Sequence, residues 1–178
     1  MPDVAVERTL PHSLDAEKSV LGAVLIHNEA FNHAAEHIDA RDFFRDAHRR
    51  IFNSMVVLSE RNDPIDFVTL REELSRTGQL DEVGGPAYIA SLADGVPRSA
   101  NVEYYARIVK EKSTLRNLIH SANKILTEAY EAEQEPDLLL DEAERAIFAI
   151  AEDRIRAGFV PLRDLVQSGS ATIEKLQQ

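Results

Sequence analysis

The sequence contains no cysteine, and this absence excludes several classes of protein. Disulfide-stabilised folds, thiolate enzymes and cysteine-type zinc sites all need this residue. The chain also has no apolar run approaching the roughly 18 residues of a membrane-spanning helix, and no charged-then-apolar leader at its start. We therefore expect a cytoplasmic protein that has no contact with a membrane.

Glycine is scarce too, and its placement argues against a nucleotide site. None of the seven glycines precedes a lysine, so the sequence has no P-loop. The stretch "VGGP" at 83–86 is too short for a dinucleotide-binding loop, and we interpret it as a turn in which glycine permits positive φ. The sequence therefore predicts no cofactor and no ATPase activity for this chain.

Basic residues are in the minority, with 20 lysines and arginines against 31 acidic residues and a net charge of -11. Such a surface repels phosphate backbones unless its basic residues are tightly clustered. The densest group of basic residues is Arg41, Arg45, Arg49 and Arg50, and the two aspartates Asp42 and Asp46 lie among them. We do not expect this chain to bind nucleic acid directly.

One short motif nevertheless suggests a metal site. The segment "HAAEH" has the H-x-x-E-H spelling of one class of zinc peptidase, with His33 and His37 as ligands and Glu36 as the base. On a helix both histidines point roughly 200° to 240° away from Phe31, which faces the core, so a solvated helix face explains them. A catalytic zinc also needs a third protein ligand and a protected cleft. We expect no bound metal, and a metal-dependent hydrolase is kept as an alternative function.

Apolar residues recur at intervals of three and four along most of the chain, which is the periodicity of amphipathic helices. Aromatic residues make up only 6% of the chain, and valine and isoleucine rarely alternate with polar residues, so no β-strand competes. His48 lies on an apolar stripe, and we expect it to be a hydrogen-bonded core residue. The predicted helices span about residues 14–27, 28–38, 44–56, 67–77, 86–92, 102–130, 138–157 and 161–176.

These helices fall into three parts, and we predict an all-α fold. A small helical head at residues 10–97 is followed by a long antiparallel helical hairpin at 101–157 and by a linker region with one helix at 158–178.

Two of these parts carry apolar residues without an internal partner. The stripe of the hairpin exceeds what two antiparallel helices can bury, so it predicts self-association, which we assign to Tyr105, Val109 and Leu126. The last helix is marginal on its own and therefore predicts a docking surface. The residues of that surface are Leu162, Leu165, Val166, Ile173 and Leu176.

Several blocks of the sequence resemble one known family. The opening "LPHSLDAEKSVLGAVL" is similar to the start of the bacterial replicative DNA helicase of the DnaB family, and "NVEYYARIVKEKSTLRNLI" is similar to a later block of the same domain. Matching residues between them include Asp42-Phe43 and Val83-Gly84-Gly85. The ordered set covers residues 11–119 and is specific, although each block alone is weak. Gly169 departs from the pattern because it interrupts the predicted linker helix.

The resemblance implies the N-terminal domain of the helicase together with its linker, and therefore no enzyme in this chain. In that family a separate motor domain holds the P-loop and uses ATP and Mg²⁺, and it would make the parent protein an ATP-dependent DNA helicase. The N-terminal domains pair into dimers, three of which form one tier of a hexameric ring. The linker helix is expected to pack on the motor domain of a neighbouring subunit.

The resemblance also implies a partner. The family's N-terminal domain docks the C-terminal helicase-binding domain of primase, and a helicase loader is a further candidate partner. Asp15, Tyr88, Ile119 and Ile125 match positions that we expect to face the primase. A helical adaptor unrelated to replication is the remaining alternative.

Overall fold

The computed structural model describes residues 9–94, 96 and 101–156, with side chains described as far as residue 153. Within these ranges the chain forms helices and no strand, which confirms the predicted all-α fold. None of these helices is long and apolar enough to cross a membrane. In chain order they are α1 (Leu14–Ile26), α2 (Ala30–Ala35), the 3-10 helix η1 (Ala40–Asp42), α3 (Asp46–Glu60), α4 (Phe67–Arg76), α5 (Gly85–Asp94), α6 (Val102–Glu131) and α7 (Pro136–Arg156).

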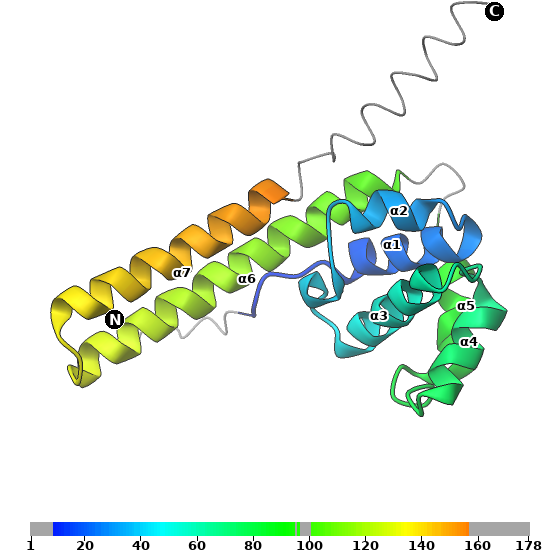
Figure 1. Ribbon diagram of the computed structural model, residues 1–178. Coiled ribbons are helices and arrows are strands. Elements are labelled where there is room, and N and C mark those ends of the chain that lie inside the picture. Colours follow the sequence, from blue (N-terminus) through cyan, green and yellow to red (C-terminus); the bar gives the residue numbers. More distant parts are fainter. Residues whose placement is uncertain (1–8, 95, 97–100, 157–178) are drawn as a thin grey trace, which may run out of the picture.

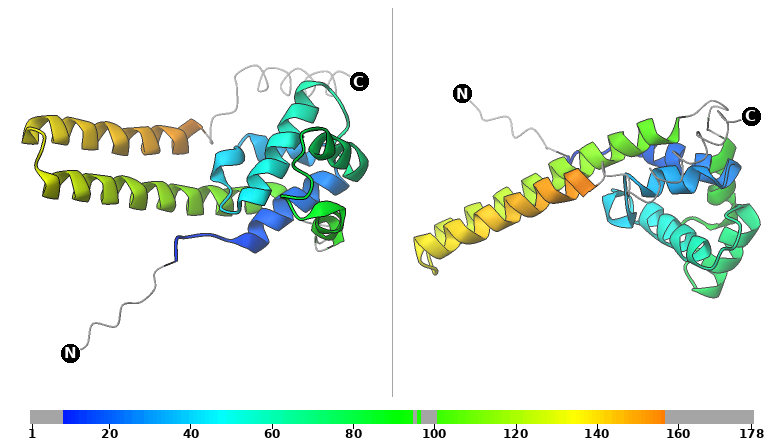
Figure 2. Two further views of the ribbon diagram at one scale, coloured as in Figure 1. Left: turned by 90° about the horizontal axis from the view of Figure 1, so that it is seen from below. Right: turned by 45° about the horizontal axis from the view of Figure 1, so that its top comes forward.

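The helices form a head and a projecting hairpin. Helices α1 to α5 gather at one end of the molecule, while α6 runs out of this head and α7 returns beside it (Figure 1). Figure 2 shows from two further directions that most of the hairpin extends beyond the head. The chain reverses at Ala132, which adopts a left-handed conformation with φ 51° and donates its N–H to the carbonyl of Glu128. A head followed by an antiparallel hairpin was predicted, and the structure confirms it.

Helix α6 belongs to both parts. Its first turns contribute Val102, Ala106 and Val109 to the head core, and from Asn117 onward every residue of α6 is half-buried or exposed. The core that these turns complete is built from the head helices and from the segment before α3. Its largest fully buried apolar side chains are Leu21, Phe43, Ile51, Phe52, Met55, Leu70, Leu74 and Ile89.

The helix expected at 28–38 is shorter in the structure. It covers Ala30–Ala35, and the chain then restarts at Asp39, whose carboxylate accepts the N–H of Arg41 while the carboxylate of Asp42 accepts the N–H of Asp39. This reciprocal cap satisfies amides that would otherwise continue the first helix. Ala35, at the end of this shorter helix, is exposed.

The next helix, α3, begins at Asp46 rather than near Phe44. The amides of Phe44 and Arg45 donate to the carboxylate of Glu17 at 2.6 Å and 3.4 Å, so both lie outside the helix. Glu17 thus caps the start of α3 from a distant helix, which is a form of capping that local sequence patterns do not reveal.

Helices α1 and α5 pack closely at Gly22. A side chain there would place its Cβ 2.0 Å from the carbonyl oxygen of Leu92 and 2.3 Å from a methyl group of Val96. Both distances are shorter than any real contact, so the two helices require glycine at this position. The packing of α5 on α1 matters for function because α5 carries Tyr88.

Replacing Gly22 with alanine should therefore destabilise the head. Overpacking of this kind costs about 1–3 kcal/mol, and we expect the free energy of unfolding in urea to fall by about 2 kcal/mol. Lys18→Ala, at an exposed position on the same helix, is the matched control and should change it by less than about 0.5 kcal/mol. Equal stability of the two variants would contradict the close helix packing.

Candidate functional site

The "HAAEH" segment does not assemble a metal site in the part of the chain that the structure describes. No group of three histidine, aspartate or glutamate side chains is placed there to hold a metal. His33 is exposed and lies 3.5 Å from Glu103 of α6, and Glu36 is exposed. His33 and Glu36 therefore lie on a solvated face of the head, while Ala34 between them is buried in the core.

A buried polar network lies beneath Tyr88 and joins three head helices. Glu17 of α1 and His48 of α3 are only 1% and 0% exposed, and Glu17 Oε2 lies 2.5 Å from His48 Nδ1. His48 Nε2 lies 2.7 Å from the hydroxyl of Tyr88, and Arg45 donates to the same hydroxyl at 2.9 Å. Donors and acceptors balance when Nδ1–H donates to the carboxylate and the Tyr88 hydroxyl donates to Nε2. The predicted role of His48 as a hydrogen-bonded core residue is confirmed.

The network fixes the orientation of the Tyr88 ring. The ring stacks on His48 with 6.1 Å between centroids and 11° between planes, and the guanidinium of Arg45 lies 4.7 Å from its centroid. Burial raises the pKa of the Tyr88 phenol above its ordinary value, while the positive charge of Arg45 acts in the opposite direction. Since the hydroxyl is already bonded inside the head, Tyr88 offers a partner chiefly the accessible part of its ring.

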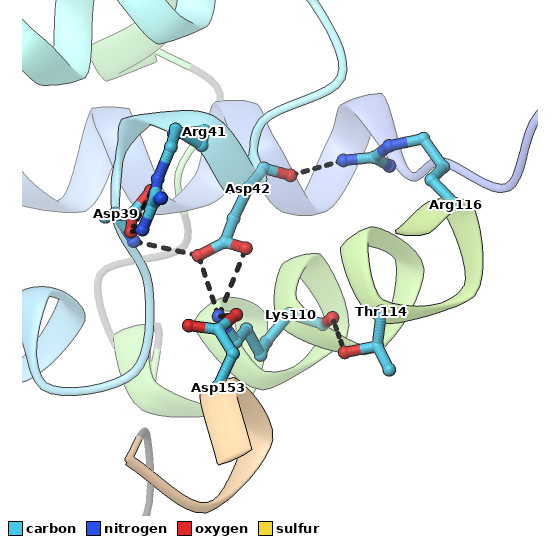
Figure 3. Close-up of polar contacts among 7 residues, drawn as sticks. All are labelled: Asp39, Arg41, Asp42, Lys110, Thr114, Arg116 and Asp153. Carbon is cyan, nitrogen blue, oxygen red and sulfur yellow. Dashed lines mark hydrogen bonds and ion pairs between the residues drawn. The ribbon is translucent and has the colours of Figure 1, made fainter. Parts of the chain in front are cut away.

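A second polar cluster lies where the head meets the hairpin (Figure 3). Lys110 of α6 donates to both carboxylate oxygens of Asp42 at 3.2 Å and to Asp153 of α7 at 2.6 Å. Arg116, further along α6, is 5% exposed and donates to the backbone carbonyls of Asp42 and Pro11 at 2.5 Å and 2.7 Å. The cluster therefore ties the Pro11 and Asp42 segments and α7 to α6.

Both cations of this cluster are partly withdrawn from water. Burial is the largest effect on Lys110 and disfavours its charge, but the hydrogen bond with Asp153 and the charge of Asp42 outweigh burial and raise its pKa. Burial lowers the pKa of Arg116 below its ordinary value. A guanidinium nevertheless stays charged near neutral pH, and that of Arg116 lies 5.6 Å from the centroid of the Phe44 ring. Charge and ring contact together hold Arg116 in place.

The outer part of the hairpin exposes large apolar side chains from both of its helices. Their exposure ranges from 37% for Leu118 to 83% for Tyr130. Soluble proteins rarely leave such a concentration of apolar surface open to water unless it serves as an interface. At helical spacing these residues point to more than one side of the hairpin. Together we call them the hairpin face: Leu115, Leu118, Leu126, Tyr130, Leu138, Leu140, Ile147 and Phe148.

The residues that we assigned to self-association do not share one surface. Leu126 lies on the hairpin face, and Tyr105 is half-buried against the head core. Val109 is 2% exposed, so the expectation for it is corrected: the head's own core consumes its side chain. The apolar residues predicted for the linker, Leu162, Leu165, Val166, Ile173 and Leu176, lie outside the described residues.

The residues expected to face the primase occupy several elements. Asp15 is exposed in the first turn of α1, and Tyr88 is half-buried on α5. Ile119 and Ile125 are both half-buried on α6. At helical spacing Ile125 lies on the same side of α6 as Lys110, which faces α7, whereas Ile119 lies on a different side. Helical spacing thus separates Ile125 from Ile119 on α6.

The polar residues that organise the head were not recognised from the sequence. No contact was predicted for Glu17, Lys110, Arg116 or Asp42. Their partners lie 27 to 105 residues away in the chain. An acidic residue on the apolar side of a helix was the one available signal, because such positions are rarely filled by unpaired carboxylates.

The N-terminal part of the sequence matches a family model. Residues 9–111, which are more than half of the chain, match the model described as DnaB-like helicase N terminal domain. The chain belongs to this family. The resemblance drawn from the sequence blocks is therefore confirmed, and a DnaB N-terminal domain is favoured over a metal-dependent hydrolase or an unrelated adaptor.

Individual relatives agree with this assignment. The replicative DNA helicase DnaB of Geobacillus stearothermophilus is 43% identical over 176 residues, which are 99% of this chain and 39% of that protein. The chain thus spans about two fifths of the length of this relative. The crystal structure of the N-terminal domain of DnaB helicase from Mycobacterium tuberculosis superposes with a TM-score of 0.76 at 34% identity, covering 79% of this chain and 99% of that one.

A third relative shares the fold at lower identity. The N-terminal domain of DnaB helicase from Helicobacter pylori, described with its interactions with primase, superposes with a TM-score of 0.58 at 23% identity. It covers 65% of this chain and 90% of that one.

Replacing Glu17 with glutamine should destabilise this DnaB N-terminal domain. The neutral amide accepts more weakly from the Phe44 and Arg45 amides and from the fully buried ring of His48. Hydrogen bonds to charged groups are worth about 1.5–3 kcal/mol, so we expect the free energy of unfolding in urea to fall by about 3 kcal/mol.

Glu111→Gln, at an exposed position on α6, is the matched control for loss of one negative charge. It should leave the unfolding free energy within about 0.5 kcal/mol of the parent. If Glu17→Gln is as stable as this control, the buried network does not hold the head together.

Proposed function

We propose that this chain is the non-catalytic N-terminal domain of a hexameric replicative DNA helicase, in which it joins subunits and docks primase. The observation that carries the proposal is the hairpin face, an apolar surface with no partner in the described chain. The Geobacillus relative is a replicative helicase, and the chain spans 39% of it. On this proposal ATP and Mg²⁺ are used by a motor in the rest of the parent protein.

Self-association through the hairpin face follows from its composition. Tyr130 and Phe148 bring aromatic rings, each of which buries about 150–250 Å² when fully covered, and the other six residues of the set are aliphatic. The set includes residues from both α6 and α7, so contacts between copies can involve either helix. A two-fold axis lets each copy offer the same patch to the other, which is the commonest way for identical chains to pair.

Replacing Leu126 and Phe148 together with serine should weaken this association. Both side chains are more than half exposed, so the change removes apolar contact area without opening a core. We expect the dissociation constant from sedimentation equilibrium to rise at least about tenfold, equivalent to about 1.4 kcal/mol.

Val68→Ser provides a control for this experiment, because Val68 is 56% exposed on α4 of the head and lies off the hairpin face. It should leave the dissociation constant unchanged. A parent chain that stays monomeric at high micromolar concentration would contradict the proposal outright.

Primase docking is supported by the accessible ring of Tyr88 and by the position of Ile119. Interface anchors are apolar or aromatic side chains held in one orientation, and His48 and Arg45 hold Tyr88 in this way. A chain of contacts leads from Tyr88 through His48, Glu17 and Phe44 to Arg116, one turn before Ile119. Asp15 adds an exposed charge for the rim. The Helicobacter pylori domain, which shares this fold, is described with its interactions with primase.

Alanine at Tyr88, Ile119 or Ile125 should each weaken binding of the primase C-terminal domain by more than about 1 kcal/mol, as the loss of an interface anchor does. Isothermal calorimetry measures the affinity, and thermal unfolding of each variant shows whether the head stays folded. Tyr88→Phe is the matched control, because it keeps the ring and removes only the hydroxyl that faces His48 and Arg45. Three folded variants that bind primase like the parent would place the docking surface elsewhere.

A further inference from the structure

Helix α7 presents one narrow stripe to the rest of the molecule. Among its described side chains only five are half-buried, and they follow the alternating three-four spacing of a coiled-coil seam. Four of the five are apolar, but the last position of the stripe is an aspartate. These residues are Leu139, Ala143, Ala146, Ile150 and Asp153.

Asp153 ends the stripe in an ion pair rather than in apolar packing. Its carboxylate accepts from Lys110 of α6 at 2.6 Å, and Lys110 in turn donates to Asp42 of the head (Figure 3). Among the described side chains of α7, at residues 136–153, Asp153 is the one that forms an ion pair with another helix. The end of α7 is therefore held through one lysine that it shares with the head.

The two ion pairs of Lys110 differ in their burial, and we call the pair with Asp42 the inner arm and the pair with Asp153 the outer arm. The side chains of Lys110 and Asp42 are 12% and 5% exposed, whereas that of Asp153 is 44% exposed. Breaking the inner arm to Asp42 leaves a buried carboxylate without its cation, which is strongly unfavourable. Breaking the outer arm releases Asp153 into water, and such exposed pairs shift an equilibrium only about two- to fivefold.

The space between the head and the end of α7 contains little that resists separation. A cleft of about 480 Å³ lies there, and the head contributes to it only the charged residues Asp39, Arg41 and Asp42. On the α7 side Ala149, Ile150, Glu152 and Asp153 border the cleft. Because the residues on the head side are all charged, separating the head from α7 breaks no contact between two apolar side chains, and water can solvate the charged groups that separate.

We propose that Lys110 and Asp153 form a salt-sensitive latch between the head and the end of α7. The ion pair with Asp42 keeps Lys110 in place, while the ion pair between Lys110 and Asp153 breaks and re-forms. Opening lets the last turns of α7 move away from the head while the root of α6 stays anchored in the core. The latch therefore sets the direction of the last turns of α7 relative to the head.

Paired spin labels measure this motion directly, because the absence of cysteine allows labels at chosen sites. We place them at Asn53 of α3 and Ala151 of α7, both exposed, and dilute the labelled full chain with excess unlabelled protein to suppress distances between copies. Asp153→Asn should broaden the distance distribution, with the ratio of open to closed populations rising about two- to fivefold. High salt should broaden the parent's distribution similarly and leave that of Asp153→Asn nearly unchanged.

Glu152→Gln is the matched control, since it removes the same charge from the neighbouring residue, which borders the cleft without a described ion pair. It should leave the distribution narrow. A second label pair, at Asn53 and Glu111 of α6, should not respond to any variant, because the root of α6 lies in the core. The latch is refuted if Asp153→Asn keeps the parent's distribution, if Glu152→Gln broadens it equally, or if the second pair moves as much as the first.

Discussion

The insertion of the first turns of α6 into the head core is the contact on which the rest of the molecule depends. Val102, Ala106 and Val109 pack among the side chains of the head helices, so a helix of 30 residues is anchored at one end. Arg116 completes the anchor by donating to the Pro11 and Asp42 carbonyls. This contact, which we call the root of α6, sets the position of the rest of α6 and of α7 relative to the head.

Polar groups give the head its definite shape, and they do so because they are buried. An apolar core of this size would tolerate several arrangements of short helices, but a buried carboxylate must find its donors. Glu17 meets this requirement in one arrangement, with the start of α3 and His48 both against its oxygens. His48 in turn is hydrogen-bonded to Tyr88, so buried polar contacts in the core also fix the orientation of this surface residue.

Much of the fold followed from local patterns. Periodicity located the helices, including the one predicted at 67–77, which Gly78 follows with φ 70° while Gln79 donates its N–H to the carbonyl of Leu74. Periodicity could not tell burial within one chain from burial between chains, which is why Val109 was assigned to an interface. The ion pairs escaped prediction for a different reason. Lys110 meets Asp42 and Asp153 across 68 and 43 residues, and no spacing rule connects positions so far apart.

The long part of α6 that extends beyond the head has a mechanical consequence. About 15 residues follow Arg116 before the hairpin turns, and at 1.5 Å per residue they make an arm about 22 Å long. A rotation of about 10° at the root would carry the tip about 4 Å, roughly three quarters of the 5.4 Å rise of one helical turn. Small adjustments around Arg116, transmitted by a stiff helix, thus become displacements large enough to change which side chains two neighbouring tips bring together.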